Sequence, residues 1–246
     1  MSFIYCDAET HSIIDIVENR QLDFLKQYFY RFPRNIREKV KYIVMDMYSP
    51  YISLVKECFP NAEIIMDKFH VINNFARALN KTRIRLMNSN KKLYNKLKNY
   101  YKLLLKDRRK VDSMHYAKRK CFNKWMSLRD IVDHLLAQDE ELKNTYELYQ
   151  SLLFAIKTKN EDLLRDILMS EHKNVSDYMK KAMGTARKYS KYIINMVKYS
   201  YNNGVIEGIN NKIKALKRIA FGYRSFYHFM NRILIMFDLI SMEKVA

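Results

Sequence analysis

Glu207 is the only acidic residue in the basic segment 201–232, a setting that suits phosphate chemistry. A helix from Val205 onward would place four polar side chains on one face, within roughly 40° of each other: Glu207, Asn211, Lys214 and Arg218. The opposite face would form a buried apolar stripe of Ile209, Ile213, Leu216 and Ala220. A carboxylate among amides and cations fits a metal site beside a phosphate backbone. The alternative is a solvated Glu on an ordinary amphipathic basic helix.

Two further carboxylates each follow an apolar run. Asp46 follows Val40–Met45 and Asp67 follows Ala62–Met66, with a helical pattern between them that starts near Ser49. The pattern predicts a βαβ unit, in which both strands end at the same edge of a sheet, where ligand clefts form.

His70 completes an Asp-Lys-Phe-His sequence with Asp67. A neutral imidazole there could orient a water, a phosphate or Asp46. The alternative is a helix-start Asp beside a packed His. A zinc site is not indicated, because further ligands do not lie nearby in sequence.

The remaining pattern predicts an α/β fold that is mostly α. Phe3–Cys6 and Ile13–Val17 read as short strands, and Gln21–Tyr30 reads as a helix. Helical periodicity then runs from Phe69 to about Lys198. It predicts helices over Asn73–Met87, Lys91–Leu105, Ala117–Leu136, Glu140–Lys157, Asn160–Met169 and Asn174–Met183.

The net charge of +19 is concentrated in two parts of the 246-residue chain. Residues 81–125 hold 16 basic and two acidic side chains, and residues 180–232 hold 12 basic and one acidic. Residues 126–179 between them hold six basic and 11 acidic side chains. Two basic surfaces of this kind indicate a polyanionic partner such as nucleic acid. A membrane surface is a weaker interpretation, because 103–105 is the only compact apolar cluster in the first basic segment.

Three dispersed cysteines, Cys6, Cys58 and Cys121, indicate a reduced compartment and no disulfide framework. Because no apolar run is long enough to span a membrane and no signal peptide is evident, a cytoplasmic location is expected.

Three ordered blocks resemble bacterial insertion-sequence transposases of the ISL-three type, which carry a DDE, ribonuclease-H-like catalytic domain. The blocks are VKYIVMDMYSPYISLVKECFPNAEIIMDKFHVINNFARALN, LLLKDRRK and NNGVIEGINNKIKALKRIAFGYRSFYHFMNRIL. The resemblance implies that Asp46 and Glu207 are the second and third catalytic carboxylates and hold Mg²⁺, with Mn²⁺ as an alternative. His70 and Asp67 are secondary candidates. DNA contacts are expected from Asn211, Lys214, Lys217, Arg218 and Arg224.

The resemblance also implies the domain organisation. Residues 1–72 form a partial ribonuclease-H-like core, 73–198 a helical insertion, and 199–246 return helices carrying the third carboxylate. The first core strand, which bears the first catalytic Asp in this family, is not found. Neither Asp7 nor Asp15 stands at the position expected for this first catalytic Asp. The expectation is an N-terminally truncated transposase.

Two functions follow. The first is that of a transposase fragment, with DNA binding and metal-dependent strand cleavage and transfer as its function. This fragment is expected to be inactive alone. The alternative is a non-catalytic basic nucleic-acid-binding protein that modulates a full-length transposase. A helical scaffold for acidic partners is a third, weaker reading. The expected partner is duplex DNA, at the element ends and the target, with a homodimer left open and no membrane or small-molecule cofactor expected.

Trp125 is the only tryptophan of the chain and ends the first basic segment. A lone indole predicts a core anchor. The resemblance leaves open an alternative, because aromatic residues of the insertion stabilise an extruded base in some transposases.

Overall fold

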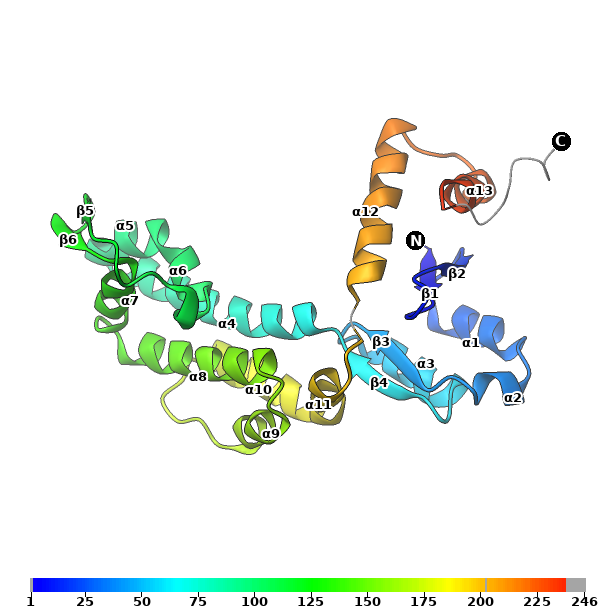
Figure 1. The fold of residues 1–246 in the computed structure, drawn as a ribbon, viewed down its shortest axis with the longest axis horizontal. Coiled ribbons are helices and arrows are strands. Elements are labelled where there is room, and N and C mark those ends of the chain that lie inside the picture. Colours follow the sequence, from blue (N-terminus) through cyan, green and yellow to red (C-terminus); the bar gives the residue numbers. More distant parts are fainter. Residues whose placement is uncertain (1, 202, 238–246) are drawn as a thin grey trace. The chain divides into compact units, whose positions relative to one another are not determined.

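The chain folds as two compact units in a computed structural model that describes residues 2–201 and 203–237 (Figure 1). The first unit combines Met1–Asp67 with Tyr201–Ala246, and the second is Lys68–Ser200. Residues 238–246 of the expected C-terminal segment lie outside the described residues. The predicted class, α/β and mostly α, is confirmed. Within the described ranges, no helix is long and apolar enough to cross a membrane.

The first unit begins with an antiparallel hairpin whose two faces pack against different helices. The two predicted strands are present, and β1 (Phe3–Cys6) pairs with β2 (Ile13–Val17). One face carries Phe3, Tyr5 and Val17, which pack with α1 (Leu22–Tyr30) and α3 (Ser49–Cys58). The other face carries Ile4, Ile13 and Ile16, which pack with α12 (Gly204–Ile219) and α13 (Phe226–Met236). The alternation of side chains along a pleated strand therefore joins the two ends of the sequence in one core.

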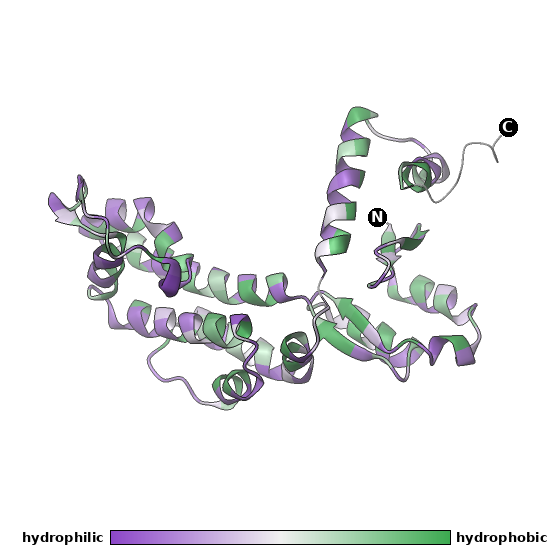
Figure 2. Ribbon diagram, in the orientation of Figure 1, coloured by the Kyte–Doolittle hydropathy of each residue, from purple (hydrophilic) through white to green (hydrophobic). Residues whose placement is uncertain are grey.

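The predicted βαβ unit is also present. The short helix α2 (Arg34–Arg37) leads to β3 (Tyr42–Met45), which pairs in parallel with β4 (Glu63–Met66) across helix α3. Both strands are strongly apolar, as Figure 2 shows. Among the described residues, the β1–β2 and β3–β4 pairs are separate sheets.

Helix α12 buries the predicted apolar stripe only in part. Ile209 and Ile213 are buried and Leu216 packs at the edge of the same cluster. Ala220 is exposed, which corrects its predicted burial, because the helix ends at Ile219.

The second unit is built around the long helix α4 (Lys68–Ser89). The other helical segments are α5 (Lys91–Asn99), α6 (Tyr101–Leu105), η1 (Arg108–Lys110), α7 (Leu128–Leu136), α8 (Glu140–Lys157), α9 (Glu161–Met169), α10 (Asp177–Lys188) and α11 (Ser190–Lys198). Helices α5, α8 and α10 pack against α4. Three fully buried hydroxyls link α4, α8 and the start of α10: Thr82 donates to Ser176 at 2.6 Å, and the Ser176 amide donates to Thr145 at 3.0 Å. These bonds satisfy polar groups that burial would otherwise destabilise.

The predicted helix over Ala117–Leu136 is wrong in its first half. β5 (Ala117–Arg119) and β6 (Lys124–Met126) form an antiparallel hairpin there, and α7 begins only at Leu128. The turn places Asn123 at φ 50°, a left-handed conformation that a helix does not allow but Asn tolerates. A capping box between Ser127 and Asp130 then starts α7.

Trp125 is not a core anchor, which corrects the first interpretation of that residue. Its side chain lies on the β5–β6 hairpin and is 69% exposed.

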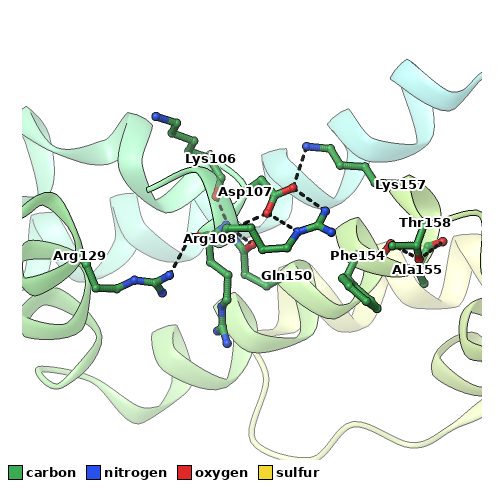
Figure 3. Close-up of polar contacts among 10 residues, drawn as sticks. Lys106, Asp107, Arg108, Arg129, Gln150, Phe154, Ala155, Lys157 and Thr158 are labelled. Atoms are coloured by element: carbon green, nitrogen blue, oxygen red, sulfur yellow. Dashed lines mark hydrogen bonds and ion pairs between the residues drawn. The ribbon is translucent and has the colours of Figure 1, made fainter. Parts of the chain in front are cut away.

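A buried carboxylate, Asp107, ties the loop after α6 to helix α8 (Figure 3). It accepts hydrogen bonds from the Arg109 amide at 3.0 Å and from the Arg109 guanidinium at 2.8 and 3.1 Å. Lys157 of α8 donates to the same carboxylate at 3.1 Å. Nearby, the Gln150 side chain accepts from the Arg108 amide and donates to the Lys106 carbonyl. Hydrogen bonds from the Arg109 side chain, aided by Lys157, hold the pKa of Asp107 well below its usual value.

We predict that Asp107→Asn lowers the free energy of unfolding by about 1–3 kcal/mol near neutral pH, because it removes a charged acceptor from a buried network. The folded-state pKa is depressed, so this contribution is full above about pH 4 and is lost as pH falls toward the folded pKa. Urea unfolding at a series of pH values measures it. Asp133→Asn, an exposed carboxylate on α7, is the matched control. Equal stability of Asp107→Asn and the wild type near neutral pH would contradict the assignment.

Candidate active site

The register of the β3–β4 pair places Asp46 beside Asp67. Met45 and Met66 are the last paired residues of the two parallel strands. The Asp67 amide continues the ladder by donating to the Met45 carbonyl at 2.9 Å. Asp46 and Asp67 are therefore neighbours where both strands end, the position that sheet geometry predicts for ligand-binding residues. Asp67 is only 4% exposed, and Asp46 is partly buried.

His70 joins these two carboxylates from the first turn of α4, three residues after Asp67. One ligand atom each from Asp46, Asp67 and His70 lie within 4.8 Å of one another, close enough to share a metal ion. Carboxylate oxygen and imidazole nitrogen are common ligands of divalent metals. This cluster contains one of the two carboxylates expected as primary ligands and both of the secondary candidates.

Asn203 connects the start of α12 to the cluster. Its side-chain amide donates to the Asp46 carboxylate at 3.3 Å, across 157 residues of sequence. Asn at this N-cap position normally caps its own helix, but the Asn203 side chain makes no capping bond. The structure therefore uses this amide for a tertiary contact with Asp46.

Glu207 lies one helical turn beyond Asn203. The Glu207 amide donates to the Asn203 carbonyl at 3.1 Å, and residues four apart share one side of a helix. The Glu207 side chain is exposed. Among the described residues, Glu207 is not part of the group that lies within 4.8 Å.

The predicted DNA-contacting residues are all exposed. Asn211, Lys214, Lys217 and Arg218 lie on α12, and Arg224 lies in the loop before α13. Lys214, Lys217 and Arg218 line a shallow open hollow together with Phe221 and Gly222. Phe221 is fully exposed.

Neither Asp7 nor Asp15 belongs to the metal-ligand cluster. The Asp7 carboxylate accepts from the Glu9 and Thr10 amides and from the Thr10 hydroxyl within the β1–β2 turn. These bonds lower the pKa of Asp7. The Asp15 carboxylate accepts from the Tyr28 hydroxyl and from the Ile16 amide. Both carboxylates thus have local structural partners.

Sequence reasoning missed the role of Asn203 at this site. The one available signal was its place directly before Gly204, at the expected start of the return helix.

Comparison with known proteins identifies the family. A family model described as Transposase, for DDE transposases of the ISL3 type, matches residues 1–233. The chain is 24% identical over 239 residues to the transposase for insertion sequence element IS1001 of Bordetella parapertussis, covering 94% of this chain and 55% of that protein. It is 40% identical over 110 residues to a protein named ATP-dependent protease of Lactococcus lactis subsp. lactis, covering 43% of this chain and 34% of that protein.

The chain thus spans about half of the length of the IS1001 transposase and about a third of the length of the protein named ATP-dependent protease. No solved structure matches it. The family model covers most of the chain, and in this family catalysis implies use of a divalent metal, for which the Asp46, Asp67 and His70 cluster offers ligands. The chain belongs to the ISL3-type DDE transposase family.

Proposed function

We propose that this chain is a catalytic-domain part of a DDE transposase that binds duplex DNA in the cytoplasm and carries an incomplete site for strand cleavage and transfer. The observation that supports this most directly is the hydrogen bond from Asn203 to Asp46. It ties the helix that carries Glu207 to the strand end that carries Asp46. Family membership supports the reaction class.

The residues at this site fit a divalent cation. Asp46 and Asp67 supply oxygen ligands, which Mg²⁺ prefers, and His70 supplies a nitrogen ligand, which Mn²⁺ accepts more readily. Asp46 and Glu207 remain our proposed principal ligands. The exposed Glu207 side chain, one turn from Asn203, would have to reach the Asp46 carboxylate to share an ion with it. When bound, divalent ions would activate the attacking oxygen and offset charge on the leaving oxygen of a phosphodiester.

The surrounding residues have distinct proposed roles. Lys214, Lys217 and Arg218 converge on one hollow and would hold phosphates of the bound DNA. Asn211 and Arg224 would extend this contact along α12 and the following loop. His70 would orient a phosphate or water beside Asp46, or move a proton there.

We further propose a ribonuclease-H-like arrangement that lacks one carboxylate within the described residues. The separate β1–β2 and β3–β4 pairs support this, because a strand between them would join both into one sheet. Burial supports it too: β1 has no buried residue and β3 has one, whereas β4 has three. Asp7 and Asp15 already have structural partners. Strand transfer by the chain alone is therefore not expected.

The alternative is a non-catalytic protein that binds nucleic acid and modulates a full-length transposase. It is favoured by the absence of Glu207 from the group of ligand atoms within 4.8 Å, among the residues described. It predicts that the added chain slows an active transposase of the family on its own DNA ends. Unchanged strand transfer in that mixture would favour the first proposal. A homodimer is compatible with both.

For DNA binding, we predict strong salt dependence and little sequence preference. Affinity for duplex DNA should fall by orders of magnitude between about 50 and 200 mM salt, because phosphate contacts release counterions. Replacing Lys214, Lys217 and Arg218 together by Ala should reduce the logarithmic salt slope by roughly one per residue. Fluorescence anisotropy of a labelled duplex measures both.

The control removes exposed lysines from the acidic segment instead: Lys143→Ala with Lys173→Ala. Its salt slope should match that of the wild type. A wild-type affinity that hardly changes with salt, or equal slopes for the two multiple variants, would refute the assigned DNA contacts.

For catalysis, we predict that the chain alone neither nicks nor joins a plasmid carrying the element's ends, in Mg²⁺ or in Mn²⁺. The two-ion reaction needs carboxylates for both ions, and the proposed set lacks one. Agarose gels of the plasmid topoisomers provide the measurement. Activity that persists in Asp7→Asn but disappears in Asp46→Ala would show a complete site and overturn the proposal of inactivity.

A further inference from the structure

The turn between α12 and α13 exposes a large aromatic side chain (Figure 1). Phe221 lies two residues after the end of α12 and is fully exposed. Ile219, the last residue of α12, is 78% exposed. Neither side chain belongs to the core that Ile209 and Ile213 form with the β1–β2 hairpin. Burial therefore does not explain why apolar residues stand at this helix end.

The backbone at Phe221 has a conformation that is unusual for an aromatic residue. The Gly222 amide donates to the Lys217 carbonyl and the Phe221 amide donates to the Arg218 carbonyl, each at 3.1 Å. These two bonds form a Schellman motif, in which Phe221 takes the left-handed position that is usually occupied by Gly. The φ of Phe221 is 52°, and Gly222 follows at 103°. Phe221 is strained there because its Cβ crowds the backbone, a strain that Gly would avoid.

A strained and exposed Phe is best explained by a role outside the fold. Strained backbone conformations cluster at binding and active sites, where the strained conformation serves function. At this helix end, the two hydrogen bonds of the Schellman motif hold Phe221 on a short, defined turn. The turn therefore presents one apolar ring at a fixed place on the surface of the first unit.

Cations lie beside Phe221. Three of them line the same shallow hollow as Phe221 and Gly222: Lys214, Lys217 and Arg218. Residues 180–232 as a whole hold 12 basic side chains and one acidic side chain. This charge attracts a polyanion and would hold its phosphates next to the Phe221 ring.

Duplex DNA matches this combination better than a lipid surface does. Proteins that bend DNA often insert an apolar side chain such as Phe between neighbouring base pairs. Binding to an anionic membrane instead scales with the apolar area that is buried, and Ile219 and Phe221 offer only a small area. A single ring in a fixed place, with cations beside it, is therefore better suited to the space between two base pairs.

We propose that Phe221 is a wedge that inserts from the minor groove between two neighbouring base pairs of duplex DNA and bends the duplex. Lys214, Lys217 and Arg218 hold the phosphates beside the inserted ring. The proposal rests on the proposed DNA-binding function and adds a deformation of the DNA to it. The base pairs are partly unstacked but stay paired, so no base leaves the duplex. Bending brings more of the DNA against the protein, which offsets the cost of unstacking.

Energy transfer between dyes at the two ends of a duplex measures the bend. The duplex of about 24 base pairs carries a central TA step, because pyrimidine–purine steps kink readily. We expect the wild-type chain to raise the transfer efficiency through a bend of roughly 20–90°. Anisotropy of the same duplex with a single dye records binding separately from bending.

Three substitutions of Phe221 test the wedge. At saturating protein, Phe221→Ala and Phe221→Gly should return the transfer efficiency to that of the free duplex, because neither side chain fills the space between base pairs. Phe221→Leu should retain part of the bend, because Leu also acts as a wedge. None of the three substitutions removes a charge, so the logarithmic salt slope of binding should stay unchanged.

Thermal stability separates loss of the wedge from loss of the fold. Phe221→Gly should melt at or above the wild-type temperature, because Gly adopts the left-handed conformation without strain. Phe24→Ala removes a ring that is 42% exposed on α1 and is the matched control. This control should bend the duplex as the wild type does.

Each contrary outcome has one meaning. Binding without a rise in energy transfer, or an unchanged bend with Phe221→Gly, overturns the wedge and leaves the proposed function intact. A lower melting temperature of Phe221→Gly assigns Phe221 to the fold instead. Absence of duplex binding overturns the proposed function itself. Binding of the wild type to anionic vesicles that Phe221→Ala weakens, with no bend in DNA, assigns Phe221 to a membrane surface.

Discussion

The pairing of β3 with β4 is the constraint on which the rest of the candidate active site depends. A parallel ladder with Met45 opposite Met66 leaves Asp46 and Asp67 as adjacent residues at one edge. A shift of one residue would turn every side chain of a strand to the other face. Because Ile64, Ile65 and Met66 are buried and Glu63 before them is exposed, such a shift would move Glu63 into the buried part of β4. The apolar core thus fixes the spacing of the two carboxylates.

A second tie brings the C-terminal part of the chain to the same site. Helix α12 packs Ile209 and Ile213 onto the β1–β2 hairpin, and Asn203 at its start donates to Asp46. Burial of Ile209 and Ile213 positions the helix, and the hydrogen bond from the Asn203 side-chain amide to Asp46 orients the start of the helix. Polar residues on the outer side of α12 are then free to contact a ligand. One helix therefore serves as a core element, as a support for Asp46 and as a basic surface.

Much of the fold could be predicted because its signals are local. The bounds of β1, β2 and α8 follow from alternation and from helical periodicity, and Asp46 and Asp67 follow from the ends of apolar runs. The hairpin at Trp125 was missed because three-residue strands carry too little pattern to compete with helical neighbours. Trp125 was predicted to be buried because of its residue type. Residue type alone does not show whether neighbouring side chains cover the ring. Asn203 was missed because its partner lies 157 residues away.

We propose that Asp46 and Glu207 serve one metal site, with Asp67 and His70 beside Asp46, and metal-directed cleavage tests this proposal most directly. Fe²⁺ accepts carboxylate and imidazole ligands, and with ascorbate and peroxide it generates radicals that cut the backbone near the bound ion. Mass spectrometry of the fragments should find cuts near Asp46, near Asp67 and between Asn203 and Glu207. Asn203→Ala should weaken the third group of cuts and keep the first two. Cuts near Asp46 and Asp67 with none near Glu207 in the intact chain would contradict the account.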